Sequence, residues 1–234
     1  MDIDVVILCG GMGSRLRPVV ADRPKPMAPI GQRPFLDLLI DQFRRFGFRR
    51  FVLCTGYMSE AIESHYADST GDIEVTISHE SQPLGTAGAV KNAERYIRTD
   101  PFLVANGDSF CQADLVAFVR FHRARNGVLS MVVTPSQDPE DYGTVIVDAS
   151  QRITGFQEKA GTKPGGWINA GIYLFSKQVL SAIPAGAKSS LECDIFPKLL
   201  PVHCNAFPVQ VPVLDIGTPQ RLAVARSSLI ANSQ

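Results

Sequence analysis

The 234-residue sequence is 45% hydrophobic and 20% charged, and its 23 basic residues balance its 23 acidic residues. This composition indicates a globular protein with a sizeable core, and the zero net charge argues against nucleic acid or an anionic membrane as the main partner. No apolar stretch approaches the roughly 20 residues of a membrane span, and the acidic N-terminus does not fit a signal peptide, so we expect no membrane partner and a cytoplasmic protein.

Strands and helices alternate over the first 135 residues. Apolar runs predict strands over 4–10, 49–56, 72–78, 101–108 and 128–135. Amphipathic periodicity predicts helices over 34–47, 59–67, 85–97 and 113–127. Pro34 opens the first of these helices and Gly47 closes it. This alternation predicts a parallel sheet covered by helices on both faces.

The second half of the chain has a different pattern. A hairpin is expected over 143–159, a strand over 167–175, a short helix within 188–200 and a strand over 206–217. Residues 218–231 predict a closing helix with Thr218 as its N-cap and Pro219 at its first position. We expect one catalytic domain with a sheet extension over the carboxyl ends of the strands.

The five cysteines are scattered, odd in number and never spaced C-x-x-C. They are Cys9, Cys54, Cys111, Cys193 and Cys204. This usage favours buried thiols over disulfides or a zinc site.

The stretch LCGGMGSRLRP, residues 8–18, combines glycines and arginines in a turn after a strand, which is typical of phosphate binding. It is not a dinucleotide fingerprint, because Leu16 stands where G-x-G-x-x-G needs its third glycine. It is not a P-loop, because Arg15 and Leu16 stand where that motif needs glycine. A tight turn without a ligand is the alternative for this stretch alone.

Lys25 follows, clamped between Pro24 and Pro26. Since proline fixes its own φ and restricts the residue before it, we expect Lys25 on a stiff extended segment. Ten residues after Arg15, it suggests a second phosphate contact, the alternative being a solvated surface charge.

Six short motifs occur in order along nearly the whole chain. They are GGMGSRLRP with RPKP (10–18, 23–26), QPLGTAG (82–88), NGDSF (106–110), EK (158–159), NAGIY (169–173) and DIGTP (215–219). Together they resemble the signature of the sugar-1-phosphate nucleotidylyltransferases. NGDSF and the short length are most similar to the D-glycero-D-manno-heptose 1-phosphate guanylyltransferases of surface polysaccharide synthesis.

The resemblance implies a Rossmann-like three-layer αβα fold of the GT-A type with a mixed, mainly parallel sheet. It implies a single domain, with a nucleotide-binding half at 1–135 and a sugar-phosphate-binding half at 136–234, and no appended β-helix domain. The implied reaction transfers a nucleotidyl group from a nucleoside triphosphate to a sugar 1-phosphate and releases pyrophosphate. A homodimer is one assembly to expect, and the sequence shows no pattern that identifies its interface.

A sugar phosphate is already largely a dianion at neutral pH, because its second pKa is near ~6. The reaction therefore needs positioning and charge neutralisation rather than a base, and none of the four histidines lies in a motif. By resemblance, Arg15 grips the departing phosphates, and Lys25 lies near the α-phosphate and the attacking oxygen. With Asp108, these are the predicted catalytic residues.

The resemblance also assigns binding residues. Those for the nucleotide are Leu8, Gly10, Gly11, Gly13, Ser14, Arg15, Gln82, Gly85, Thr86 and Asn106. Those for the sugar phosphate are Tyr142, Gly143, Glu158, Lys159, Asn169 and Gly171.

Asp108 ends an apolar strand, where a carboxylate is either a helix cap or a metal ligand. The cap of the following helix is expected nearer Gln112. The resemblance pairs Asp108 with Asp215 on one Mg²⁺ ion, which needs only one or two protein carboxylates besides phosphates and water.

The base and sugar stay open at this point. Many guanylyl-transferring relatives have Glu-Pro-Leu-Gly where this chain has Gln82-Pro83-Leu84-Gly85, and glutamine also suits a pyrimidine. The alternatives are transfer to mannose 1-phosphate, transfer from UTP, dTTP or CTP, a non-catalytic nucleotide-sugar-binding regulator and, more remotely, a dinucleotide oxidoreductase.

Overall fold

The computed structural model describes residues 1–67, 71–136, 142–158, 166–200 and 202–231. Four parallel strands form one half of its main sheet. They are β1 (Asp4–Leu8), β4 (Arg50–Thr55), β5 (Glu74–His79) and β6 (Phe102–Asn106). The other half, in chain order, is β8 (Leu129–Pro135), β9 (Thr144–Val147), β10 (Ile153–Gln157), β11 (Trp167–Phe175) and β12 (Cys204–Pro208).

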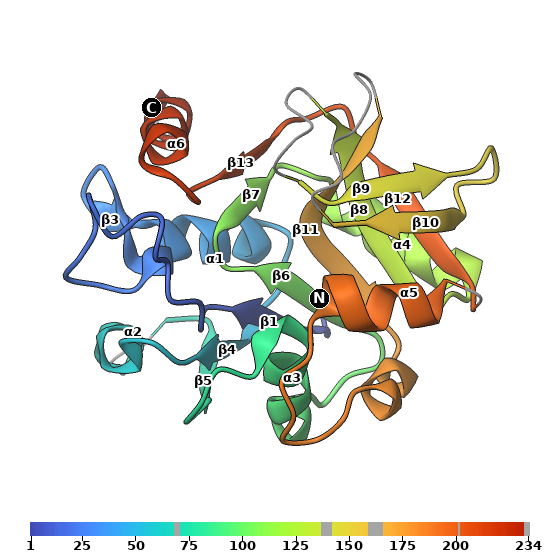
Figure 1. Cartoon of the computed structure of the whole chain (residues 1–234), viewed down its shortest axis with the longest axis horizontal. Helices are drawn as coiled ribbons and strands as arrows, with labels where there is room; N and C mark the ends of the chain where they lie inside the picture. Colours follow the sequence, from blue (N-terminus) through green and yellow to red (C-terminus); the bar gives the residue numbers. More distant parts are fainter. Residues whose placement is uncertain (68–70, 137–141, 159–165, 201, 232–234) are drawn as a thin grey trace.

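These nine strands of the described residues pair in the order β10-β9-β11-β6-β1-β4-β5, and β8 pairs with both β11 and β12 (Figure 1). Strand β11 runs antiparallel to β6 and β8, whereas β1 is parallel to β4 and β6. The sheet is therefore mixed and mainly parallel, which confirms the predicted fold class.

Helices cover both faces of this sheet. The α-helices are α1 (Phe35–Arg45), α2 (Ser59–Tyr66), α3 (Gly85–Asn92), α4 (Leu115–Arg125), α5 (Phe196–Leu199) and α6 (Pro219–Ala231). Shorter helical turns are η1 (Lys25–Met27), η2 (Glu94–Tyr96), η3 (Lys177–Ala182) and the π-type turn η4 (Leu191–Ile195).

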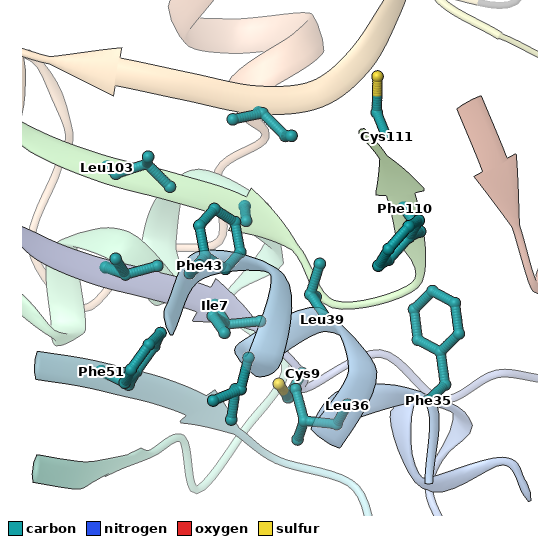
Figure 2. Close-up of a cluster of buried hydrophobic side chains, with 14 of the residues drawn as sticks. Ile7, Cys9, Phe35, Leu36, Leu39, Phe43, Phe51, Leu103, Phe110 and Cys111 are labelled. Carbon is teal, nitrogen blue, oxygen red and sulfur yellow. The ribbon is translucent and has the colours of Figure 1, made fainter. Parts of the chain in front are cut away.

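Two apolar clusters form because side chains of one strand alternate between faces. In β1, Val5 and Ile7 point to the cluster under α1, α2, α4 and α6, and Val6 points to the cluster under α3, η3 and α5. Figure 2 shows the first cluster, with Phe43 of α1 over Ile7 and Leu103 of the sheet. A strand buried on both faces reads as a continuous apolar run, which is why β1 was predictable.

A small second sheet lies beside the first. It consists of β7 (Ser109–Cys111) and β13 (Val213–Asp215), which pair antiparallel beneath α6 (Figure 1). Phe110 of β7 meets Phe35 of α1 edge-on, with 6.4 Å between ring centroids, so the small sheet is fastened to the core of the large one. A two-stranded ribbon of β2 (Pro29–Ile30) and β3 (Arg33–Pro34) precedes α1.

Several predicted elements differ in the structure. The strand expected over 206–217 is wrong as one element, because Pro208 ends β12 and Pro212 precedes β13, and proline donates no ladder hydrogen bond. The helix expected over 85–97 ends at Asn92 and continues only as the turn η2.

The segment around Lys25 is also not extended as expected. Lys25 begins the 3₁₀ turn η1, in which the amide of Met27 donates to the carbonyl of Pro24 at 2.8 Å. Pro26 fits this turn because its missing N–H is not needed there.

All five cysteines are free thiols, as predicted, and four of them are buried while Cys193 is exposed. Within the described residues, no helix is long and apolar enough to cross a membrane.

Candidate active site

The glycine loop after β1 folds back against η1. Gly13 has a left-handed φ of +56°, and a Cβ there would lie 3.0 Å from the Cβ of Lys25. Leu16, which is buried, anchors the turn, and its amide donates to the Gly13 carbonyl at 2.9 Å. The tertiary structure therefore places Lys25 directly beside the loop, as two phosphate contacts require.

Lys25 and Asp108 form an ion pair across the site. The Lys25 ammonium donates to Oδ2 of Asp108 at 2.5 Å, and Ser109 Oγ donates to Oδ1 at 3.1 Å. Burial raises the pKa of the Asp108 carboxyl, but the charge of Lys25 and these two hydrogen bonds outweigh burial and hold the pKa below its usual value. Asp108 is therefore a carboxylate at neutral pH.

Asp108 does not cap a helix. Helix α4 starts at Leu115, and its cap is Asp114, whose Oδ1 accepts from the amides of Val116 and Ala117 at 3.0 Å each. The cap position expected near Gln112 is wrong, since an aspartate two residues later satisfies the first helical N–H groups better than glutamine does. The Asp108 carboxylate is thus left to face the site.

Asp215 reaches the same site from the end of the chain. In the small sheet it stands opposite Ser109, and the amide of Ile216 donates to the Asp108 carbonyl at 3.0 Å. Its carboxylate accepts from the Gly217 amide at 2.8 Å and from the Tyr142 hydroxyl, and it lies 3.2 Å from a guanidinium nitrogen of Arg221.

The first cavity beside the loop measures about 290 Å³. The predicted nucleotide residues that line it are Leu8, Gly10, Gly11, Gly85, Thr86 and Asn106. Gly13, Ser14 and the exposed Gln82 do not line it. Sequence reasoning missed two charged residues that do, Glu80 and Lys188.

Glu80 lies at the end of β5 and packs onto two glycines. Its Oε1 would be 2.7 Å from a Cβ at Gly10 and 2.8 Å from a Cβ at Gly56, so an alanine at either position would displace the carboxylate. Its Oε2 accepts from the amide of Leu84 at 3.2 Å. Burial raises the pKa of Glu80 above its ordinary value, and this hydrogen bond and the charge of His79 offset only part of that.

The second cavity, about 200 Å³, is also bordered by Asp108. The predicted residues that line it are Arg15, Lys25, Asn106, Asp108, Tyr142, Gly143, Glu158, Asn169 and Asp215. Lys159 lies outside the described residues. Sequence reasoning missed Ser109, Glu192, Gly217 and Arg221, which line this cavity as well.

Gly171 shapes this cavity without lining it. It has a φ of +76° where the pairing of β11 with β8 shifts register, and its amide donates to Oδ1 of Asn169 at 2.9 Å. Asn169 Nδ2 in turn donates to the Tyr173 hydroxyl at 2.7 Å. The bulge at Gly171 therefore fixes the Asn169 side chain at the cavity wall.

Lys25, Asn106 and Asp108 line both cavities. The two spaces therefore meet at one charged junction. Arg15 and Lys25 approach it together, since a Cβ at Gly217 would lie 3.6 Å from Lys25 Nζ and 3.8 Å from Arg15 Nη2. Such a junction can hold a multiply charged anion between a ligand in each cavity.

Within the described part of the chain, no cluster of three or more His, Cys, Asp or Glu side chains is arranged to hold a metal. Asp108, just before β7, and Asp215, at the end of β13, are two carboxylates that line one cavity. Mg²⁺ in proteins is usually held by one or two carboxylates together with phosphate and water oxygens. Asp108 and Asp215 therefore suit a Mg²⁺ ion whose remaining ligands come from a bound phosphate and from water.

Gly85, at the start of α3, packs against the main chain at Ser189. It has a φ of +73°, and a Cβ there would lie 2.5 Å from the Ser189 carbonyl oxygen.

Gly186, which lies three residues before Ser189, provides a matched control, since it has a φ of +68° but nothing within 4 Å of a Cβ. Both alanine variants carry similar backbone strain, so Gly85→Ala should lower the free energy of unfolding more than Gly186→Ala, by about 1–3 kcal/mol for the added clash. Urea unfolding of the two variants measures this difference, and equal losses would contradict the contact.

Comparison with known proteins agrees with this architecture. Residues 4–231 match the family described as nucleotidyl transferase. The chain is 35% identical to a D-glycero-alpha-D-manno-heptose 1-phosphate guanylyltransferase of Aneurinibacillus thermoaerophilus, over 97% of this chain and 98% of that protein. It is also 35% identical to a mannose-1-phosphate guanylyltransferase of Mycobacterium tuberculosis, over 85% of this chain but only 55% of that longer protein.

Among solved structures, the chain is similar to HddC from Yersinia pseudotuberculosis in complex with GMP-PN, with a TM-score of 0.86 and 33% sequence identity. The match covers 97% of this chain and 99% of that one. The similarity therefore extends over both cavities and the junction between them.

Proposed function

This chain belongs to the nucleotidyl transferase family and is a sugar-1-phosphate nucleotidylyltransferase, and we propose that it transfers GMP from GTP to D-glycero-α-D-manno-heptose 1-phosphate. The products are then GDP-heptose and pyrophosphate. The heptose is supported by a relative that matches this chain over nearly its full length under that name. Mannose 1-phosphate, named for the mycobacterial relative, is the alternative acceptor.

The observation that carries the reaction is the shared junction of the two cavities. A nucleotide in the first cavity and a sugar phosphate in the second meet at Lys25 and Asp108. A phosphate oxygen of the sugar attacks the α-phosphorus and forms the new P–O bond. The bond from the α-phosphorus to the bridging oxygen breaks, and its electron pair leaves with pyrophosphate.

No protein base is required for this step, since the attacking phosphate is largely a dianion at neutral pH. Lys25, held at the junction, neutralises charge at the α-phosphate and orients the attacking oxygen. Arg15, exposed at the rim of the loop, binds the departing phosphates. Positioning and preorganised charge together supply the rate enhancement.

Mg²⁺ is part of the proposal, and Asp108 and Asp215 would hold it. When bound, it neutralises phosphate charge and polarises phosphoryl oxygens as a Lewis acid. Lys25 pairs with Asp108, and Arg221 pairs with Asp215, so both carboxylates are held in place.

The preference for GTP is supported by Glu80. Guanine offers two neighbouring donors, N1–H and the N2 amino group, and a carboxylate can accept from both. Uracil and thymine offer one N–H between two carbonyl oxygens, which a carboxylate repels. A carboxylate in the nucleotide cavity therefore favours guanine, and it supplies the acceptor that the exposed Gln82 was expected to supply.

Glu80→Gln is expected to raise the KM for GTP about 10- to 100-fold, because a hydrogen bond to a charged group contributes about 1.5–3 kcal/mol. The wild-type KM should also rise as the pH falls through the elevated pKa of Glu80, because the protonated carboxyl no longer accepts from both donors. This rise in the KM for GTP at acid pH should be absent in Glu80→Gln. Steady-state kinetics against pH measure both effects.

The competing assignment to Gln82 predicts the reverse pattern. Gln82→Ala would then raise the KM for GTP, and Glu80→Gln would leave it unchanged. If so, Glu80 is only a structural carboxyl beneath the loop.

Pyrophosphate release tests the function directly. The enzyme with Mg²⁺ is given GTP, UTP, CTP, dTTP or ATP, each with the heptose 1-phosphate or with mannose 1-phosphate. Release with GTP and the heptose phosphate supports the proposal. Release with mannose 1-phosphate alone replaces the acceptor, and release with a pyrimidine nucleotide alone replaces the base. The cytoplasmic location and the homodimer are separate predictions, which pyrophosphate release does not test.

A further inference from the structure

The second cavity contains a carboxylate that neither the reaction nor the motifs have used, Glu192 of the turn η4. Its Oε2 accepts from the hydroxyl of Thr86 at 2.7 Å and from the hydroxyl of Ser190 at 2.7 Å. Two donors on one oxygen fix the orientation of the whole carboxylate.

The turn that carries Glu192 is held against the start of α3. The Ser189 carbonyl accepts from the amides of Ala87 and Gly88 at 3.0 and 3.2 Å. The amide of Leu191 donates to the Thr86 hydroxyl at 2.8 Å. Thr86 thus accepts from the backbone of the turn and donates to its carboxylate, so the single proton of its hydroxyl is committed to Glu192.

The other oxygen of Glu192, Oε1, has no hydrogen-bond partner among the described residues. No basic side chain of the described chain lies within 4 Å of this carboxylate either, in contrast to Asp108 and Asp215 at the other end of the cavity. A carboxylate without a counter-ion repels phosphate and accepts well from neutral hydroxyl groups.

The second cavity is consequently divided by chemistry. Arg15 and Lys25 lie near Gly217, and Lys25 and Arg221 pair with Asp108 and Asp215. Glu158, Asn169 and Glu192 gather instead around Tyr173: burial and then the charges of Glu192 and Glu158 raise its pKa, and Asn169 donates to its hydroxyl. A sugar phosphate has the same polarity, with an anionic group at one end and hydroxyl groups at the other.

We propose that Glu192 is a sugar-recognising residue that accepts a hydrogen bond from a hydroxyl group of the sugar 1-phosphate, and that Thr86 is its positioning residue. The inference rests on the proposed function, since it assigns a role within the acceptor site of that reaction. It also gives Thr86, which itself lines the first cavity, a role toward the sugar through Glu192.

Kinetics of Glu192→Gln test the first half. The KM for the sugar 1-phosphate should rise at least about tenfold, as expected for the loss of a hydrogen bond to a charged group. The KM for GTP should stay near its wild-type value. Cys193→Ser, an exposed neighbour in the same turn that lines neither cavity, is the control for disturbance of the turn and should change neither KM.

A set of singly deoxygenated sugar 1-phosphates identifies the contact. In the wild type, the analogue that lacks the bonded hydroxyl should show a raised KM. In Glu192→Gln, the penalty for that same analogue should largely disappear, because the partner has already been weakened. A merely structural role for Glu192 would leave every analogue penalty unchanged, and this result would overturn the proposal.

Thr86→Val and Thr86→Ser test the second half. Valine has a similar shape without the hydroxyl and should raise the KM for the sugar phosphate, whereas serine should restore it. An effect of Thr86→Val on the KM for GTP alone would contradict the positioning role. Failure of the wild type to turn over any sugar 1-phosphate with GTP would reject the proposed function instead, so the two failures are distinguishable.

Discussion

Replacing Asp108 by asparagine is expected to lower kcat about 10³-fold or more, since it removes a carboxylate that would share Mg²⁺ with Asp215 at the reacting phosphate. Asparagine has nearly the same shape, so the fold should persist. The variant also loses the ion pair between residue 108 and the Lys25 ammonium, because the asparagine side chain carries no charge.

Three measurements separate these effects. Pyrophosphate release gives kcat, Mn²⁺ titration by electron paramagnetic resonance gives metal affinity, and thermal unfolding gives stability. Asp114→Asn is the matched control, because Asp114 lies in the same segment but caps α4, and asparagine is an equally good cap. Undiminished turnover in Asp108→Asn would refute the metal role.

Lys25→Met is expected to lower kcat about 10²- to 10³-fold, the range found when one preorganised donor is removed from a site of developing charge. Methionine keeps most of the apolar stem, so the contact with Gly13 is preserved. The pKa of Asp108 should rise without the lysine charge, because burial then acts against fewer stabilising contacts.

The two variants should differ in metal binding. Lys25→Met should retain Mn²⁺ affinity, whereas Asp108→Asn should lose it. The exposed Lys198 on α5 provides the control Lys198→Met, which should keep full activity. Loss of Mn²⁺ binding in Lys25→Met would show that the lysine acts by shaping the carboxylate rather than by contacting phosphate. Because Lys25 and Asp108 form an ion pair, the fold-loss of kcat in the double variant should be smaller than the product of the two single losses.

The regular elements followed from local pattern. The apolar run of β1, the proline and glycine that bracket α1 and the bounds of β11 were all legible, because each depends on residues close in sequence. The alternation of such elements predicted a parallel sheet with helices on both faces, and the resemblance to the family added that the sheet is mixed and mainly parallel. The errors fell where proline interrupts a run, as between β12 and β13.

Glu80 illustrates what sequence reasoning could not reach. Nothing near it in the sequence signals a ligand, and its carboxylate packs in the nucleotide cavity against Gly10 and Gly56, which come from two other segments. These three residues are far apart in sequence, so their contact arises only from the tertiary structure. Gln82 belongs to the motif, but its side chain is exposed and outside the lining of the first cavity, so its contact with the base stays a prediction.

The sequence by itself determined the family, the order of the strands and helices and the charged residues of the junction, because these are written in ordered motifs and local periodicity. The tertiary structure alone decided which side chains meet. Asp215 reaches Asp108 through the pairing of two three-residue strands, and Thr86 reaches Glu192 through the contact of α3 with η4. Such short pairings carry little local signal, because they form from chain closure and burial of segments far apart in sequence.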